Sequence, residues 1–297
     1  MVRAKSFGTH DGNFHADEVT ACALLVSFGL IRRSLIFRTR DEKILKECDY
    51  VCDVGGILDF QKKRFDHHQN TYRGRQSSAG MVLQYLKEKQ VISEGFYHYL
   101  NDTFVRGVDL HDIGKIEPVQ GVATFSQIIS SFLPVEYVAG DRDLDRTFQE
   151  ALDFVLKYLQ RLKRRFALME KNRRLIRLKM QKKTNWLFLD KAFAWLEPFF
   201  LEGGENHPAL FIVMPLKGEW KLRAIPPSLE KRMRMRQPLP KAWGGEEGRN
   251  FEKVSKIKGA LFCHKGLFVA FFKTRAAVLK AVKIALKNQE KNDEKPV

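Results

Sequence analysis

The chain has 297 residues, of which 44% are hydrophobic and 29% charged, and its formal net charge is +17. This composition excludes a disordered or fibrous chain and provides core material for one large domain or two ordinary ones. There is no apolar run long enough to cross a bilayer and no apolar signal region at the start, so we expect a cytoplasmic protein without a membrane partner. The strong positive charge favours a polyanionic partner, nucleic acid first, over an anionic membrane surface or a role in solubility alone.

In the first half of the chain, short apolar runs alternate with helical patterns. We expect strands at residues 5–10, 35–38, 50–53 and 64–66, and helices at residues 16–28, 42–47, 78–89, 94–109 and 122–132. Strands that alternate with helices are typical of βαβ units. The sequence therefore predicts an α/β catalytic domain over residues 1–135, with a mainly parallel sheet and helices on both of its faces.

A long helical pattern without Pro or Gly follows at residues 141–183, and its second half is crowded with Lys and Arg. We interpret residues 136–184 as a basic helical connector. Its basic side is either a solvated surface or a surface that follows a phosphate backbone, and for the stretch as a whole we favour polyanion contact.

The last third of the chain returns to strand patterns. We expect strands at residues 209–213, 220–225, 259–263 and 267–271, followed by a helix at residues 275–288. These elements predict a smaller α+β domain over residues 185–290, which would bind the substrate, and a disordered polar tail at residues 291–297.

Ligand-type side chains gather at the ends of three predicted strands. They lie in residues 8–18 (Gly-Thr-His-Asp-Gly-Asn-Phe-His-Ala-Asp-Glu), 53–56 (Asp-Val-Gly-Gly) and 65–69 (Phe-Asp-His-His-Gln), and residues 109–112 (Asp-Leu-His-Asp) add an acidic cluster at the end of a helix. In open α/β sheets, ligands bind beyond the carboxyl ends of the strands. Mixed imidazole and carboxylate ligands favour manganese, zinc or iron over calcium.

This set of residues suits phosphoester hydrolysis, in which two metal ions about 3.5–4 Å apart activate the nucleophile and stabilise the phosphoryl charge. A carboxylate between two strands can bridge the two metal ions, and Asp53 is placed for that role. Taken singly, His10 is better explained as a core or turn histidine, and Asp17 as a helix N-terminal charge. The adjacent His67 and His68 have no obvious packing role, and the clusters together favour a metal site.

With these residues assembled, the chain resembles the DHH phosphoesterases, whose name-giving triplet appears as Asp66-His67-His68. It is most similar to the melanocyte-proliferating-gene family, a branch regarded as metal-dependent hydrolases and 3′→5′ RNA exonucleases. The resemblance is carried by residues 8–18, 38–41 (Arg-Thr-Arg-Asp), 48–56, 65–69, 77–80 (Ser-Ser-Ala-Gly), 108–112, 220–226, 239–244 and 273–275. It spans nearly the whole chain.

The resemblance implies a DHH-type fold and a divalent cofactor, usually two manganese ions. It implies that the metal ligands are His10, His15, Asp17, Asp53, His67 and Asp109. Asp53, Asp66 and His68 would be the catalytic residues, with His68 near the substrate phosphate and Asp66 fixing an imidazole. The substrate contacts that it implies are His68, Arg38, Arg40, Ser77 and Ser78.

The chain departs from the family at a C-terminal Gly-Gly-His, where it has Ala270-Phe271-Phe272. Phe271 or Phe272 would either stack on a base or pack as a core strand residue, and we favour the core. The sequence predicts a metal-dependent exoribonuclease that cuts single-stranded RNA from the 3′ end through a two-metal-activated hydroxide. The alternatives are a phosphoesterase of pyrophosphate or dinucleotides, and a nucleic-acid-binding protein with reduced activity. A homo-oligomer is left open.

Overall fold

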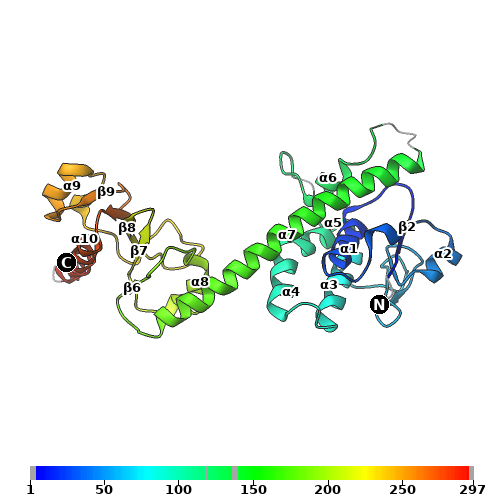
Figure 1. Cartoon of the computed structure of the whole chain (residues 1–297), viewed down its shortest axis with the longest axis horizontal. Coiled ribbons are helices and arrows are strands. Elements are labelled where there is room, and N and C mark those ends of the chain that lie inside the picture. Colours follow the sequence, from blue (N-terminus) through cyan, green and yellow to red (C-terminus); the bar gives the residue numbers. More distant parts are fainter. Residues whose placement is uncertain (1–4, 118, 136–139, 294–297) are drawn as a thin grey trace. The chain divides into compact units, whose positions relative to one another are not determined.

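The computed structural model describes residues 5–117, 119–135 and 140–293 (Figure 1). The chain divides into two compact units, the first ending at Phe166 and the second beginning at Ala167. The helix α7 (Asp141–Met180) begins where the sequence predicted it, ends three residues earlier, and contributes residues to both units. The domain boundaries expected at residues 135 and 184 stay predictions. In the part of the chain described here, no helix has the length and apolar character needed to cross a membrane.

Unit 1 is built on a five-stranded sheet in the order β2-β1-β3-β5-β4. Its strands are β1 (Phe7–Thr9), β2 (Ile36–Arg38), β3 (Tyr50–Cys52), β4 (Leu58–Asp59) and β5 (Arg64–Phe65). The neighbours β2, β1, β3 and β5 run parallel, and only β4 pairs antiparallel, with β5. The mainly parallel sheet is thus confirmed. The short strand β4 was not predicted, because two residues carry no readable alternation.

The helices of unit 1 lie close to their predicted positions. They are α1 (Ala16–Ser27), α2 (Glu42–Glu47), α3 (Ser78–Glu88), α4 (Glu94–Leu100), α5 (Arg106–Asp112) and α6 (Phe125–Ser130), with a short 3₁₀ turn η1 (Arg33–Leu35). The helix predicted at residues 94–109 is divided, because a π-helical segment η2 (Asn101–Val105) separates α4 from α5. The predicted helix at residues 122–132 is shorter than expected.

Both faces of the first sheet are covered, as predicted. Phe7, Cys52 and Phe65 pack in the main core with residues of α1 and α3. On the other face Val51 packs with Leu45 of α2 in a smaller cluster. The strand β1 approaches α2 so closely that a Cβ at position 8, a glycine here, would lie 2.9 Å from a methyl of Leu45. A larger residue at that position would have to displace the Leu45 and Cys48 side chains, so glycine fits the close packing of β1 against α2.

Unit 2 contains a second five-stranded sheet in the order β6-β7-β8-β10-β9. Its strands are β6 (Trp186–Phe188), β7 (Phe211–Leu216), β8 (Glu219–Ala224), β9 (Ala260–Cys263) and β10 (Val269–Phe272). Its helices are α8 (Leu196–Leu201), α9 (Gly248–Ser255) and α10 (Arg275–Asp293), with 3₁₀ turns η3 (Gly204–Asn206) and η4 (Lys241–Trp243). Only β6 and β7 pair in parallel. This is the expected α+β arrangement, although β6, α8 and α9 were not predicted.

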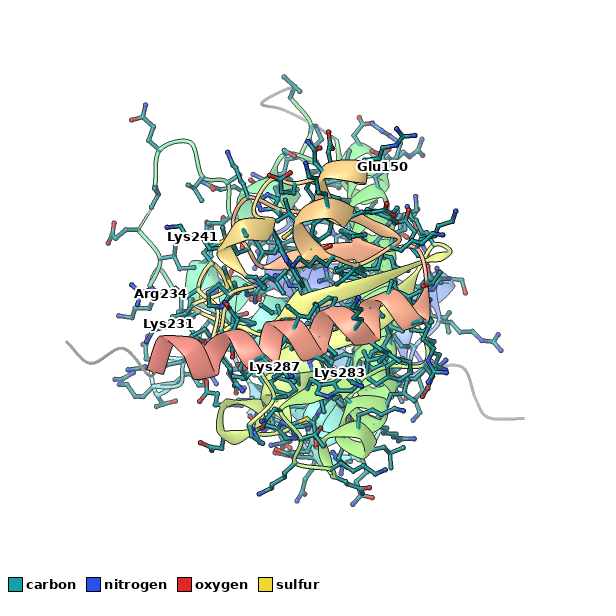
Figure 2. All side chains as sticks on the ribbon, turned by 90° about the vertical axis from the view of Figure 1, so that its left-hand side faces the viewer. Glu150, Lys231, Arg234, Lys241, Lys283 and Lys287 are labelled. Carbon is teal, nitrogen blue, oxygen red and sulfur yellow. The ribbon has the colours of Figure 1, made fainter. Side chains whose placement is uncertain are left out.

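The helix α10 lies across one face of the second sheet, in front of the strands in Figure 2. It continues to Asp293, and residues 294–297 lie outside the described residues, so the disordered tail expected at residues 291–297 stays a prediction. Phe272 faces α10 and is fully buried, which confirms the core interpretation for this residue. Phe271 lies on the opposite face of the sheet and is partly exposed.

Candidate metal centre

The carboxyl ends of β1, β3 and β5 bring ligand-type side chains together at one edge of the first sheet. His10 follows β1, Asp53 follows β3 and His67 lies two residues after β5. His10 Nε2 lies 3.2 Å from Asp53 Oδ2, and His67 Nδ1 lies 3.8 Å from Asp53 Oδ1. Asp53 is therefore central, because its strand lies between the other two.

The backbone at Asp53 is in the left-handed region, with φ at +57°. Its N–H still donates to the Phe65 carbonyl at 3.1 Å, so the strand pairing reaches this residue before the chain turns. Gly55 and Gly56 follow with φ of +92° and +64°. A left-handed conformation costs a residue other than glycine about 1 kcal/mol, and aspartate tolerates it better than most. The local turn fixes the Asp53 carboxylate at the strand end.

The first turn of α1 supplies a second set of ligand atoms. His15 caps this helix, and its backbone N–H donates to both carboxylate oxygens of Glu18, at 2.8 and 3.0 Å. Glu18 Oε1 also lies 3.3 Å from His10 Nε2. The Asp17 side chain is fully buried beside this cluster. The helix start thus holds two acids and an imidazole against the end of β1.

Several buried polar atoms of this cluster have no hydrogen-bond partner among the described residues. They are both carboxylate oxygens of Asp17, Oδ1 of Asp53 and Nδ1 of His67. Burial raises the pKa of Asp17 well above its usual range, and the charges of Asp53 and Glu18 raise it further. Unpartnered acceptors in an acidic, buried cluster fit a bound divalent cation.

Three groups of side chains bring one ligand atom each to within 4.8 Å of one another. The groups are His10, His15, Glu18 and Asp53; Asp53, Asp66, His67 and His68; and His15, Asp17 and Asp112. The first two share Asp53, and the first and third share His15. Imidazole nitrogens mixed with carboxylate oxygens fit manganese, zinc or iron. Five of the six ligands that the resemblance implied, all except Asp109, lie in these groups.

The Asp66 carboxylate holds the loop that follows β5. It accepts hydrogen bonds from the backbone N–H groups of Gly56, at 2.6 Å, and of His68, at 3.0 Å. Burial tends to raise the pKa of Asp66, but these hydrogen bonds lower it below its usual value. Asp66 therefore stays charged and binds Nδ1 of His68 at 2.8 Å. The His68 side chain is 62% exposed, so its other nitrogen is accessible.

His67 is held from the opposite side by α5. Its Nε2 lies 3.0 Å from Oδ2 of Asp112, while Nδ1 faces Asp53. Burial lowers the pKa of His67, but the Asp112 carboxylate raises it more, so the pKa lies above its usual value. This pair fixes the ring so that Nδ1 faces the cluster, which is how an outer carboxylate orients a metal-binding imidazole.

Asp109 is in a different environment from the other predicted ligands. Its Oδ1 accepts hydrogen bonds from the backbone N–H and the hydroxyl of Ser77, at 3.1 and 2.8 Å, and from the Gly80 N–H, at 2.9 Å. Burial raises the pKa of Asp109 to about 6, against the effect of these donors. Asp109 is outside the three groups described above, and its role as a metal ligand stays a prediction.

The two predicted serine contacts are buried and bonded within unit 1. Ser77 binds Asp109, and the Ser78 hydroxyl donates to the Phe65 carbonyl at 2.8 Å. Both serines therefore tie the start of α3 to the elements around the metal centre. Neither lines the pocket in front of it.

The two predicted arginine contacts differ from each other. The Arg38 side chain is only 4% exposed, binds Oδ1 of Asp145 at 2.8 Å and donates to the Gly12 carbonyl. Arg40 is 66% exposed, and its Nε lies 3.2 Å from Oδ1 of Asp11. Arg38 thus anchors the loop between β1 and α1, and Arg40 remains accessible.

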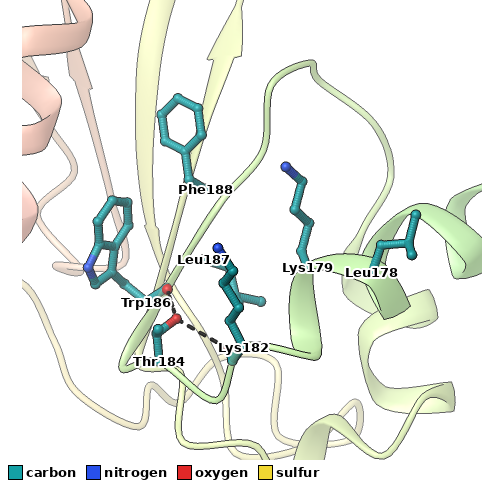
Figure 3. Close-up of a pocket in the computed structure, with 7 residues that line it drawn as sticks. All are labelled: Leu178, Lys179, Lys182, Thr184, Trp186, Leu187 and Phe188. Carbon is teal, nitrogen blue, oxygen red and sulfur yellow. Dashed lines mark hydrogen bonds between the residues drawn. The ribbon is translucent and has the colours of Figure 1, made fainter.

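A pocket of about 640 Å³ opens in front of the centre. Its lining includes His10, His15, Arg40, Asp53, Asp66 and His68 and the backbone around Gly12, Gly55 and Gly56. Figure 3 shows a different pocket, of about 470 Å³, in unit 2 between the end of α7 and β6. That pocket is lined by Leu178, Lys179, Lys182, Thr184, Trp186, Leu187 and Phe188, without a carboxylate or an imidazole. Of these two pockets, the first is the one that offers ligands to a cation.

Sequence reasoning left two acids out of the ligand set. Glu18 follows Asp17 directly in the motif of residues 8–18, and its Oε1 lies 3.3 Å from His10 Nε2. Asp112 lies three residues after Asp109, on the same side of α5. Both were inside motifs that pointed to the site. The choice between neighbouring acids depends on helix orientation, which spacing alone does not give.

The family model MYG1_exonuc, described as an uncharacterised protein family (UPF0160), matches residues 6–286. The chain is 45% identical over 289 residues to "MYG1 protein" of Chlamydia muridarum, covering 97% of this chain and 99% of that protein. It is 30% identical over 328 residues to "MYG1 exonuclease" of Homo sapiens, covering 96% and 87%.

Among solved structures, RecJ from Thermus thermophilus in complex with Mn2+ gives a TM-score of 0.27 at 12% identity. The match covers 99% of this chain and 53% of that one, and a TM-score this low does not establish a shared fold. The family match extends over nearly the whole sequence and agrees with the resemblance carried by the motifs. The chain therefore belongs to the MYG1_exonuc family.

Proposed function

We propose that this chain is a metal-dependent phosphodiester hydrolase, a 3′→5′ exonuclease of single-stranded RNA that uses two divalent cations and acts in the cytoplasm. The single observation that carries the proposal is the fully buried Asp17 carboxylate, whose oxygens accept no hydrogen bond from a described residue. Beside Asp53 and Glu18, such a group is stable only with protons or cations nearby. The relatives named MYG1 exonuclease support the type of reaction.

The described geometry suggests how the cations would be shared. His10, His15, Glu18 and Asp53 form one ligand group, Asp17 and Asp112 form another with His15, and His67 Nδ1 faces Asp53. Asp53 would contribute to both, with Asp109 nearby. When bound, two such cations supply Lewis acidity at the phosphoryl oxygens and an activated water as nucleophile. Manganese is proposed because it accepts both imidazole and carboxylate ligands.

The protein's own contribution to the reaction centres on His68. Its Nδ1 is held by the charged Asp66, so Nε2 is the nitrogen available to the pocket. In the imidazolium form, with Nδ1–H donating to Asp66, Nε2–H would donate a hydrogen bond to a phosphoryl oxygen of the substrate and pass its proton to the leaving oxygen. Because Asp66 also accepts a hydrogen bond from the Gly56 N–H, it fixes the position of the His68 ring relative to the Gly55–Gly56 turn. Such preorganisation lowers the barrier without reorganisation during the reaction.

The positive groups around the pocket suit a nucleic-acid backbone. Arg40 lines the pocket and is mostly exposed, and its ion-pair partner is Asp11. Gly12, Gly55 and Gly56 also line the pocket, and because they carry no side chain a ligand can approach the backbone closely there. An anionic phosphodiester in this pocket would therefore meet the Arg40 guanidinium as well as the bound cations.

The test is product analysis with the full chain and Mn2+. A 5′-labelled RNA oligomer should be shortened stepwise from its 3′ end. Asp53→Asn should abolish this activity while changing the melting temperature little, and Asp59→Asn, which removes a carboxylate of β4 outside the site, should leave it unchanged. Full activity of Asp53→Asn would refute the proposal. Turnover of pyrophosphate or dinucleotides alone would support a small-phosphate phosphoesterase, and RNA binding without any turnover would support a binding protein.

A further inference from the structure

Unit 2 carries two partly buried cations that have no acidic partner among the residues the structure describes. Lys221 and Arg223 lie two residues apart on β8, so their side chains are on the same face of the sheet. Burial lowers the pKa of both groups, and the charge of Arg223 lowers the pKa of Lys221 further, whereas no described carboxylate acts on either. The guanidinium of Arg223 lies 4.7 Å from the centre of the Phe268 ring. Two neighbouring cations that are half withdrawn from water favour an anionic ligand.

Aromatic side chains continue this surface across the neighbouring strands. Phe271 of β10 pairs with Lys221 on one side and with Phe262 of β9 on the other, so the three side chains form a row on one face. Phe262 and Phe271 are both partly exposed. The His264 ring, 4.4 Å from the Phe268 ring, extends the aromatic surface towards Arg223. We call the surface formed by Lys221, Arg223, Phe262 and Phe271 the open face.

The rest of the second sheet is covered, which sets the limits of the open face. On the same side, Ile212 and Met214 of β7 pack in a cluster with Ile176 of α7 and Phe199 of α8. On the opposite side, Phe272 and its neighbours are buried against α9 and α10. Within this sheet, the part over β8, β10 and β9 is where cations and rings are presented together.

We propose that the open face docks a single-stranded segment of RNA, with its phosphates at Lys221 and Arg223 and its bases stacked on Phe271 and Phe262. This inference rests on the proposed function, which it deepens by assigning part of the substrate contact to unit 2. Single-stranded nucleic acid combines regularly spaced negative charges with flat aromatic surfaces, and both features of the open face are then used. A duplex hides its base faces, and an acidic peptide would leave the rings without a partner.

The experiment measures binding without turnover, using the full chain with the Asp53→Asn change and a fluorescent oligo(rA) of about 12 nucleotides. Affinity is recorded over a range of salt concentrations. Lys221→Gln and Arg223→Gln should each reduce the slope of log K against log salt by about 0.7, the value for one lost phosphate contact on a single strand. Phe271→Ala should leave the slope unchanged and weaken binding about 5- to 150-fold.

Two comparisons separate base stacking from charge alone. An abasic oligomer of the same length keeps the phosphates, so Phe271→Ala should not change its binding. Lys283→Gln and Lys287→Gln remove the same charge from exposed positions of α10, on the other side of the sheet (Figure 2), and should leave the slope unchanged. Equal slope losses in these control variants, or equal effects of Phe271→Ala on both oligomers, would overturn the inference.

Folding and function are checked separately. Arg223→Lys keeps the charge and should keep the slope, and thermal melts show whether each variant is folded. If the chain hydrolyses RNA but the open-face variants bind it as the parent does, the inference fails and the proposed function stands. If the chain hydrolyses nothing, yet these variants lose salt-dependent RNA binding, the proposed function fails and the open face is supported.

Discussion

The Asp66 carboxylate binds both the backbone N–H and the ring nitrogen Nδ1 of His68, at 3.0 and 2.8 Å. A single buried acid thus fixes where the histidine lies and which of its nitrogens is available. Since His68 is mostly exposed, packing contributes little to holding the ring in its place.

We therefore expect Asp66→Asn to reduce kcat by about 10- to 100-fold, because an amide holds the imidazole less firmly than a charged carboxylate does. His68→Ala should cost about 10²- to 10⁴-fold if the ring supplies a proton. The double variant should be little worse than His68→Ala alone, since only the Gly56 contact of Asp66 is independent of His68. Steady-state kinetics of the two single variants and the double variant check this, and additive losses would contradict it.

The contact between α3 and Asp109 gives a stability prediction. A Cβ at Gly80 would lie 2.2 Å from Oδ2 of Asp109, so Gly80→Ala should displace the carboxylate and destabilise the fold by about 1–3 kcal/mol. In α5, a Cβ at Gly107 would meet nothing within 4 Å, so Gly107→Ala should stabilise the fold by about 0.5–1 kcal/mol. Urea unfolding of the two variants measures both changes, and equal effects would show that the close approach is unimportant.

The arginines 38 and 40 should have separable roles. Arg38→Met leaves the Gly12 carbonyl without its donor, so we expect a loss of about 1–3 kcal/mol in unfolding free energy, with metal affinity lowered about tenfold. Arg40→Met changes an exposed side chain, so stability should change by less than about 0.5 kcal/mol while KM for RNA rises. Urea unfolding, metal titration and kinetics separate the two. A stable Arg38→Met variant in which only KM is raised would show that Arg38 contacts the substrate and does not support the fold.

The acidic cluster makes stability and metal binding depend on pH in opposite directions. Burial lowers the pKa of His10, but Asp53 and Glu18 raise it to about 10 overall. Burial also raises the pKa of Asp109 to about 6 and that of Asp17 well above its usual range. Each group binds its proton more tightly in the folded state, so its contribution is complete below the unfolded pKa and is lost as pH rises through the folded pKa.

The metal-free protein should therefore lose stability between about pH 4 and pH 10. The first part is lost as the pH rises from the usual pKa of Asp109, 3.8, to about 6, and the second as it rises from the usual pKa of His10, 6.5, to about 10. Metal affinity should rise over the same range, because the ligands must be deprotonated to bind. Unfolding with a chelator present measures the first trend. Calorimetric titration with Mn2+ in two buffers of different ionisation enthalpy measures the protons released. Binding without proton release would show that these groups are not displaced by the cation.

The sequence predicted the strand-end clusters because the rule that places them, parallel strands ending at one edge, depends on strand order alone. It did not predict the contacts of Arg38, whose partner Asp145 lies 107 residues away in α7 and leaves no local pattern. Phosphate contact was the reasonable interpretation of an arginine beside a metal motif. The buried position between Phe14 and Phe148 became visible only with the packing.

The same reason explains the acids of α5. Asp109 and Asp112 lie one turn apart, and sequence spacing places both on the same side of the helix. Which of them reaches His67 depends on where Ser77 and Gly80 lie, and these residues come from a separate helix and its cap. Short elements such as β6 were also missed, because three residues in a parallel pair show no alternation that distinguishes them from a loop.

At Asp53, backbone strain and the need for a carboxylate at the metal centre oppose each other. Glycine would adopt φ of +57° without strain, and asparagine would keep the shape while removing one negative charge from a crowded acidic cluster. Both exchanges would relieve this strain or repulsion, but they would also remove the partner of His10 and the residue shared between the ligand groups. Selection for stability alone would therefore give no reason to keep aspartate at position 53, where the proposed metal binding requires it.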